Sequence, residues 1–160
     1  MSGATFRISG GAAIAAPPEV VYGIIADYRD GHPRILPAPH FSNLRVDEGG
    51  VGAGTRFRFD VRAFGRVRTL EATVEEPAPG RELVELYPAT GVVTTFRVAP
   101  LVGGGSAVTI VSDMPRRAGL LGLLERLTMP PFLRRLFADE LRRLAVVAGA
   151  TSAATPLPNS

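Results

Sequence analysis

Hydrophobic residues recur every three or four positions between Pro131 and Ala148, a spacing that predicts a long amphipathic helix near the C-terminus. Its apolar face would consist of Leu133, Leu136, Phe137, Leu141, Leu144, Val147 and Ala148. Pro130 and Pro131 should mark its beginning, because proline suits the first helical turn and ends a preceding helix. Gly149 should cap its end, and residues 149–160, which are small and polar, should form a disordered tail.

One carboxylate interrupts this apolar face. Glu140 lies in its middle, and burying a bare carboxylate is costly. Glu140 should therefore either pair with an arginine, Arg68 or Arg97, or face a cavity. In a cavity, an apolar wall would raise its pKa and suit it to acid/base work or to anchoring a ligand hydroxyl. Of these two alternatives we expect Glu140 to pair with an arginine, because buried charges are usually paired.

Strict alternation predicts a strand over residues 55–63 (TRFRFDVRA), with phenylalanines on one face and arginines on the other. A two-residue turn and a return strand should follow over residues 64–76. This pairing places Arg58 opposite Glu71, Leu70 opposite Phe59, Ala72 opposite Phe57 and Arg68 opposite Val61. Arg68 would then be a cation on the apolar face, either as a clamp for a ligand carboxylate or as the partner of Glu140.

Five further runs, alternating or rich in β-branched residues, predict strands over residues 5–15, 41–48, 82–87, 92–99 and 106–114. The pattern does not decide which faces of 82–87 and 92–99 point inward. A short helix should run from Pro18 to Asp27, and the proline-rich connection that follows it should hold one helical turn at residues 34–36.

A second leucine stripe precedes the two prolines. Leu120, Leu123, Leu124 and Leu127 predict a short helix that ends before Pro130. We expect these leucines to pack against the rim of the sheet. The alternatives are a lid, or a segment that dips into a membrane beside Arg116 and Arg117.

The order of these elements predicts an α+β fold in one domain, residues 1–148. A curved antiparallel sheet of six or seven strands would wrap round the long C-terminal helix, which is the one long amphipathic element available to cover it. Such a helix touches the sheet at its ends and leaves a gap between them. That gap would be a ligand cavity, mainly apolar with a few polar groups.

The composition excludes several kinds of chemistry. The chain has no cysteine, and therefore no disulfide, thiolate nucleophile or thiolate metal site. All 18 basic residues are arginine, so lysine Schiff-base chemistry is excluded as well. The two histidines, His32 and His40, lie in the proline-rich connection without metal-ligand spacing. We expect both to be solvated near the cavity mouth, and we expect no metal and no cofactor.

The charge pattern and the hydropathy of the chain bear on which partners and which cellular location to expect. The net charge is +3, and acids are interleaved with the arginines, so we expect no nucleic-acid binding. No segment approaches the ~18 continuous apolar residues of a transmembrane helix. Residues 10–16 (GGAAIAA) are too weakly hydrophobic for a signal peptide. These features predict a cytoplasmic protein, and they leave its oligomeric state open.

Five motifs, taken in order, carry a resemblance to a known family. They are residues 14–22 (IAAPPEVVY) with Asp27 and Tyr28 after them, residues 49–55 (GGVGAGT), residues 75–81 (EEPAPGR), residues 105–110, and the pair Glu140 and Leu141. Over residues 5–148 the chain resembles the START-like helix-grip proteins, also described as SRPBCC or polyketide cyclase/dehydrase-like proteins. The resemblance implies the helix-grip fold and a cavity for a small hydrophobic or lipid-like molecule. Members of that superfamily include lipid carriers, hormone receptors, aromatase/cyclases and ring-hydroxylase subunits.

The expected function is the binding of a small hydrophobic molecule, such as a lipid, a polyketide-like aromatic or an isoprenoid. The expected ligand-binding residues are Tyr28, Phe57, Phe59, Arg68, Leu70, Phe96, Leu133, Leu136, Phe137 and Glu140. One alternative is a polyketide cyclase/dehydratase that uses Glu140 as its catalytic acid/base group. A second alternative is a peripheral membrane lipid-transfer protein.

Overall fold

The computed structural model describes residues 3–154, in which seven strands and three helices follow one another. They are β1 (Thr5–Ile14), α1 (Pro18–Ala26), α2 (Gly31–Ile35), β2 (Phe41–Glu48), β3 (Arg56–Ala63), β4 (Arg66–Ala78), β5 (Glu82–Tyr87), β6 (Val92–Pro100), β7 (Ser106–Pro115) and α3 (Gly119–Ala154). The strands form one sheet in the order β1-β7-β6-β5-β4-β3-β2, and every pairing is antiparallel.

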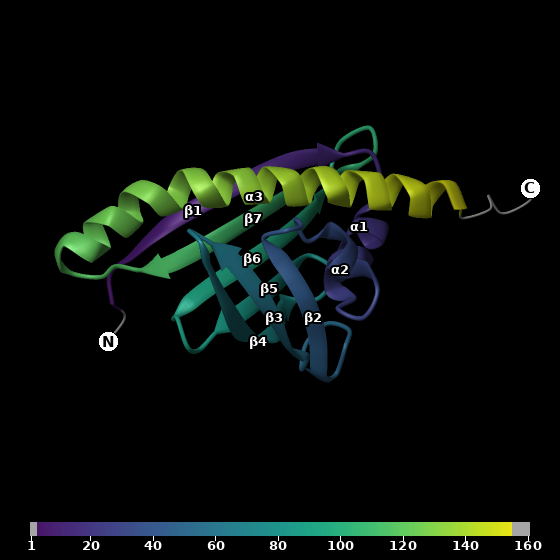
Figure 1. The fold of residues 1–160 in the computed structure, drawn as a ribbon. Helices are drawn as coiled ribbons and strands as arrows, with labels where there is room; N and C mark the ends of the chain where they lie inside the picture. The colour runs from purple at the N-terminus through teal and green to yellow at the C-terminus, as the bar shows by residue number, and fades with distance from the viewer. Residues whose placement is uncertain (1–2, 155–160) are drawn as a thin grey trace, which may run out of the picture.

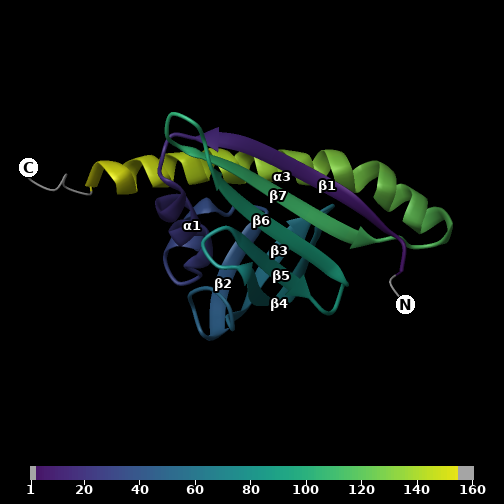
Figure 2. The same cartoon turned by 180° about the vertical axis from the view of Figure 1, so that it is seen from behind.

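The sheet is strongly curved, and α3 lies along one side of it (Figure 1). From behind, β1 and β7 follow the helix, while the middle strands turn away from it (Figure 2). The closest contacts of α3 are with β1, α1 and α2. This is the predicted α+β helix-grip fold, in which the helix touches the sheet at the margins and leaves a gap over the middle strands.

The pairing of β3 with β4 is the predicted one. Arg58 lies opposite Glu71, Phe59 opposite Leu70, Phe57 opposite Ala72 and Val61 opposite Arg68. Burial explains this register, because Phe57 and Phe59 are only 2% and 4% exposed. A slip by one residue would turn both rings out to solvent.

The beginning of α3 differs from the prediction. The helix starts at Gly119 and passes through Pro130 and Pro131 without a break. Each proline removes one N–H donor, which leaves the carbonyl groups of Arg126 and Leu127 without helical partners. Both of these residues are exposed, so their carbonyl groups can bond to water, while the opposite face of the helix packs against the core. The predicted break is therefore wrong.

The end of α3 also differs from the prediction. The helix continues to Ala154, past the expected cap at Gly149. Glycine costs only about 1 kcal/mol in a helix interior, and alanine, the best helix former, occupies positions 150, 153 and 154. The expectation of disorder is wrong for residues 149–154, and the remainder of that expected tail, residues 155–160, lies outside the described residues.

The leucines in the first turns of α3 do not pack against the sheet rim. Leu120, Leu123, Leu124 and Leu127 are 45–82% exposed. Because α3 continues through the prolines without a break, it carries these side chains beyond the end of β7 (Figure 1). The predicted rim packing is wrong for this reason.

Close packing of α3 on β1 depends on a residue without a side chain. A Cβ atom added at Gly10 would lie 3.1 Å from the Cβ of Phe137. The predicted apolar stripe forms the contact, since Leu136, Phe137, Leu141, Leu144 and Ala148 are at most 6% exposed. Small residues on β1 thus allow the helix to lie close to the sheet along this edge.

The short helices α1 and α2 pack beneath the C-terminal half of α3 (Figure 1). Pro18 opens α1, as predicted. A helical segment is also found within the proline-rich connection, but α2 spans Gly31–Ile35 and so begins three residues before the expected turn at residues 34–36. The two helices approach each other at Gly31, where an added Cβ would lie 2.6 Å from the carbonyl oxygen of Ile24.

Gly31→Ala should therefore destabilise the protein, because the new methyl group would meet the backbone of α1. We expect the free energy of unfolding to fall by about 1–3 kcal/mol, the usual effect of overpacking. Gly23→Ala is the matched control, since open space surrounds that glycine in α1. It should be neutral or stabilising by up to about 1 kcal/mol. Urea unfolding measures both variants, and equal stabilities would contradict the close contact.

Candidate functional site

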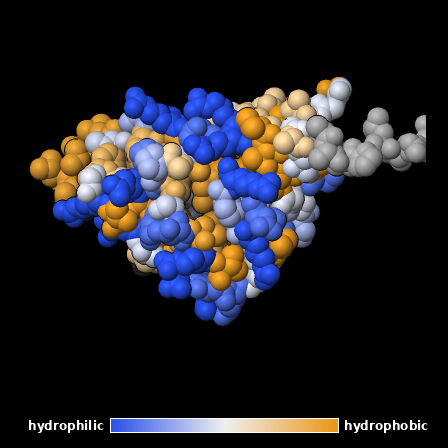
Figure 3. All heavy atoms as spheres, turned by 45° about the vertical axis from the view of Figure 1, so that its right-hand side comes forward, coloured by the Kyte–Doolittle hydropathy of each residue, from blue (hydrophilic) through white to orange (hydrophobic). Residues whose placement is uncertain are grey.

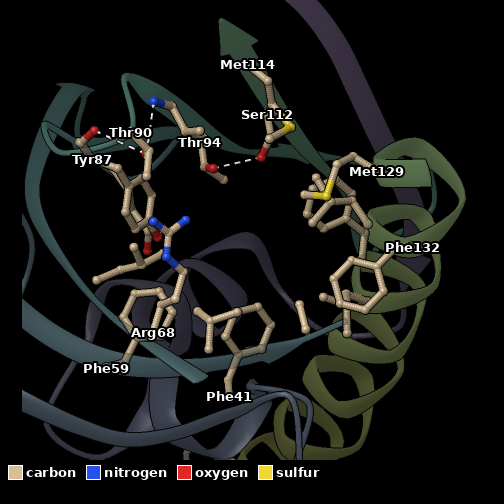
Figure 4. A pocket seen from close by; sticks show the side chains of 18 of the residues that line it. Phe41, Phe59, Arg68, Tyr87, Thr90, Thr94, Ser112, Met114, Met129 and Phe132 are labelled. Carbon is tan, nitrogen blue, oxygen red and sulfur yellow. Dashed lines mark hydrogen bonds between the residues drawn. The ribbon is translucent and has the colours of Figure 1, made fainter. Parts of the chain in front are cut away.

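A cavity of about 640 Å³ lies between the concave face of the sheet and α3. Figure 4 shows side chains that reach into it from the strands on one side and from α3 on the other. Most of the lining is aromatic or aliphatic. It includes Phe41, Phe57, Phe59, Phe96, Met114, Met129, Phe132 and Leu133. The volume falls within the range of roughly 300–1,000 Å³ that is typical of small-molecule sites.

Nine of the ten residues predicted for the site line this cavity. They are Phe57, Phe59, Arg68, Leu70, Phe96, Leu133, Leu136, Phe137 and Glu140. Tyr28 is fully buried behind the lining, where its ring stacks on His32 and Phe57 with centroids 4.5 Å apart in each pair. That these residues bind a ligand stays a prediction.

A buried carboxylate on β5 is the centre of the polar part of the cavity. Glu85 is 3% exposed. The hydroxyl of Tyr28 donates a hydrogen bond to its Oε1 at 2.6 Å, and the hydroxyl of Tyr87 donates to its Oε2 at 2.5 Å. Burial, and then the neighbouring charge of Glu85, raise the pKa values of both tyrosines. The two phenols therefore stay protonated and act as donors.

His32 belongs to the same cluster, contrary to the expectation of a solvated loop histidine. It is 2% exposed, and its Nδ1 lies 2.7 Å from the carbonyl oxygen of Ile25. Because a carbonyl can only accept, Nδ1 carries a proton. Its Nε2 lies 3.6 Å from Oε1 of Glu85. The prediction failed because α2 turns this part of the connection inward.

His40 lies nearer to the surface and is half-buried. Its Nδ1 is 3.1 Å from the carbonyl oxygen of Arg62, and its ring meets the edge of Phe132, a residue of the cavity lining, at 5.3 Å. Its predicted position near the cavity is therefore found, although the side chain is packed and hydrogen-bonded rather than simply solvated.

Glu140 lies on the cavity wall and is 5% exposed. Its Oε1 is buried and has no hydrogen-bond partner among residues 3–154. Burial raises the pKa of this carboxyl well above the ordinary value of 4.5, and the nearby charges of Glu85 and Asp139 raise it further. Glu140 therefore keeps its proton at a higher pH than an exposed glutamate does.

The predicted pairing of Glu140 with an arginine is wrong. Arg97 instead pairs with Glu82, with its Nε 2.9 Å from Oε2 of that residue, on a partly exposed part of the sheet. Arg68 is exposed and extends into the open side of the cavity (Figure 4). Arg97 lies between the buried Phe96 and Val98 on β6, so its side chain is on the opposite face of the sheet from the cavity, and Arg68 lies at an exposed position of β4.

The cavity thus combines a polar cluster around Glu85 and Glu140 with a largely apolar lining. Thr94 and Ser112 add a pair of hydroxyl groups, bonded to each other at 2.7 Å. Within residues 3–154, no group of three or more histidine, aspartate or glutamate side chains is placed to hold a metal ion. Glu140 is therefore the cavity carboxyl group with an oxygen that has no hydrogen-bond partner among the described residues, and in its protonated form it can donate to a ligand oxygen or take part in proton transfer.

Comparison with protein families matches residues 5–149 to the family described as polyketide cyclase / dehydrase and lipid transport. The chain belongs to this family. A comparison with proteins of curated function finds no match. The solution structure of the KanY protein is similar at 31% sequence identity, with a TM-score of 0.78 over 93% of this chain and 99% of that protein.

Two further solved structures share the fold. The protein TTHA0849 from Thermus thermophilus has 22% identity and a TM-score of 0.76, over 92% of this chain and 99% of that protein. The Zhui aromatase/cyclase from Streptomyces sp. R1128 has 18% identity and a TM-score of 0.75, over 94% and 98%. The helix-grip resemblance seen in the sequence is therefore confirmed. None of the helices within residues 3–154 is long and apolar enough to cross a membrane.

Five polar residues that line the cavity together with Glu140 were not predicted as site residues. They are His32, Glu85, Tyr87, Thr94 and Ser112. Glu85 offered a partial signal, because it is an acid between Val84 and Leu86. The sequence pattern did not show which face of that strand points inward, so it could not place Glu85 in the cavity. His32 gave no such signal, since its burial depends on where α2 packs.

The raised pKa of Glu140 predicts a pH-dependent stability. The folded state holds this proton more tightly than the unfolded state does. The resulting stabilisation is complete below about pH 4.5 and is lost as the pH rises through the raised pKa. Glu140→Gln removes the titration. The stability of the variant relative to wild type should therefore increase above pH 4.5, by at most ~1.4 kcal/mol per pH unit.

Urea unfolding of wild type and Glu140→Gln over a series of pH values measures this difference. Glutamine keeps the size of the side chain and both a donor and an acceptor, so the comparison isolates the ionisation. A difference that stays constant with pH would show that Glu140 does not titrate anomalously.

Proposed function

We propose that this protein binds a small hydrophobic molecule in the cavity between the sheet and α3. The observation that supports this most directly is the cavity itself, about 640 Å³ of space lined mainly by phenylalanine, leucine and methionine side chains. Protein interiors are normally close-packed, so a space of this size is typical of a binding site rather than of a packed core.

The polar groups indicate how such a ligand would lie. Its apolar body would contact the phenylalanines of β3 and β6, and an oxygen at its buried end would accept a hydrogen bond from Glu140. Arg68 extends into the open side of the cavity, where it can meet a carboxylate or another anionic group. A ligand with a polar group at each end of an apolar body suits this arrangement.

Filling the cavity should abolish binding. Leu133→Trp adds bulk at a half-buried lining position on α3, and Val146→Trp, 74% exposed on the same helix, is the matched control. We expect the first variant to weaken binding of 1-anilinonaphthalene-8-sulfonate by about tenfold or more, a change of ~1.4 kcal/mol, and the control to leave it unchanged. Native mass spectrometry of freshly purified wild type should also detect a bound molecule. Equal probe binding by both variants would place the binding outside the cavity.

A cyclase or dehydratase function is the second candidate, and the unpartnered oxygen of Glu140 favours it. A neutral acid beside a bound poly-carbonyl chain can move a proton while the walls hold the chain in a reactive shape. The Zhui structure, which shares the fold, is named an aromatase/cyclase.

This second candidate makes a separate prediction about Glu140. With a synthetic polyketide-like substrate, Glu140→Gln should lower turnover by roughly 10²–10⁴-fold, the usual contribution of acid/base catalysis, and should leave binding within a few-fold. Glu82→Gln is the matched control, because Glu82 pairs with Arg97 away from the cavity lining. Unchanged turnover in Glu140→Gln would remove Glu140 from the chemistry. A lipid-transfer role would in addition require contact with a membrane.

A further inference from the structure

The cavity opens between two segments that lie far apart in the sequence. One is the tip of the β3–β4 hairpin, which contributes Phe64 and Arg66 to the lining, and the other is the first half of α3, which contributes Leu121 and Leu124. The rings of Phe64 and Phe132 meet across this opening with centroids 5.2 Å apart. Phe64 is 64% exposed, so the edge of the mouth is apolar and open to solvent.

A patch of exposed leucines continues from this mouth. We define the leucine patch as Leu120, Leu121, Leu123, Leu124 and Leu127, which are 82%, 75%, 45%, 54% and 66% exposed. At 100° per residue these five side chains cover an arc of about 160°. Figure 3 shows hydrophobic spheres gathered at this end of the molecule. Single exposed leucines are ordinary, but five within eight residues form a contiguous apolar surface.

Arginines surround the leucine patch. Arg116 and Arg117 precede it, Arg126 lies within the same turns of helix, and Arg66 and Arg68 stand across the mouth on β4. The acid nearest in sequence, Glu125, pairs with Arg117 at 3.3 Å. The guanidinium groups of Arg66, Arg68 and Arg126 have no hydrogen-bond or ion-pair partner within residues 3–154. An apolar ridge with a cationic border is complementary to an anionic lipid surface.

We propose that this end of the molecule docks on an anionic membrane, with the leucine patch in the lipid interface and the cavity mouth facing the bilayer. The shape of the surface favours a membrane over a protein partner. A stable protein interface needs roughly 800 Å² of complementary surface on each side, whereas the patch lies within residues 120–127, on one end of a helix that extends beyond β7 (Figure 1). The position of the cavity mouth beside the patch also favours a membrane, because a hydrophobic ligand could pass between the bilayer and the cavity without crossing water.

This docking goes beyond the proposed ligand binding and can be tested without knowing the ligand. The test is co-sedimentation of the full chain with phosphatidylcholine vesicles, with and without phosphatidylglycerol, at low and high salt. We expect binding to the anionic vesicles that weakens as salt increases, because salt screens the arginines.

The variant Leu120→Gln/Leu127→Gln tests the contribution of the patch. Both leucines are exposed and neither lines the cavity, so the fold and the cavity should be unaffected. We expect vesicle binding to fall by about tenfold or more, since two apolar side chains no longer enter the interface. Val146→Gln is the matched control, at an exposed apolar position near the other end of α3, and should bind like wild type.

Several outcomes would overturn the docking proposal. They are the absence of binding to anionic vesicles at low salt, and equal binding by the double variant and wild type. A third is a dimer in solution, measured by light scattering, that the double variant converts to a monomer, which would assign the patch to a second copy of the chain. Dye binding that is sensitive to Leu133→Trp is measured separately, without vesicles, so loss of the ligand-binding function and loss of docking are distinguishable.

Discussion

The contact of α3 with the edge of the sheet is the constraint on which the rest of the structure depends. The helix lies close to β1 because Gly10 leaves room for Phe137, and its C-terminal half rests on α1 and α2. A stiff helix cannot follow a sheet that curves away from it, so a space of about 640 Å³ remains over the middle strands. The cavity is therefore a consequence of the topology, and the side chains on its walls decide only its shape and chemistry.

The two buried carboxyl groups of the cavity have different surroundings. Glu85 receives hydrogen bonds from the hydroxyl groups of Tyr28 and Tyr87 and lies beside His32. Glu140 has one oxygen without a partner among the described residues, and burial raises its pKa. Two neighbouring buried carboxyl groups cannot both be charged at low cost. The cavity therefore presents a carboxyl group that keeps its proton to a higher pH than an exposed glutamate does.

The same helix connects this buried chemistry with the surface. Downstream of Pro130 and Pro131, α3 presents the apolar stripe that lines the cavity and packs on β1. Upstream of them, its leucines face solvent beside the cavity mouth. Because the prolines do not break the helix, the cavity mouth and the buried wall both receive side chains from one continuous helix.

The sequence determined the strands, the β3–β4 pairing and most of the cavity lining, because alternation and helical spacing are local properties that survive folding. Tertiary structure alone decided which polar groups meet. Tyr28 donates a hydrogen bond to Glu85, which lies 57 residues further along the chain. His32 lies beside this pair only because α2 turns inward. Whether Glu140 met an arginine depended on which face of β6 carries Arg97 and on where Arg68 lies relative to α3, and the sequence pattern decides neither. Tertiary structure likewise decided that α3 continues through Pro130 and Pro131. One face of the helix packs against the core and the other is exposed to water, and these surroundings outweigh the low helix propensity of proline.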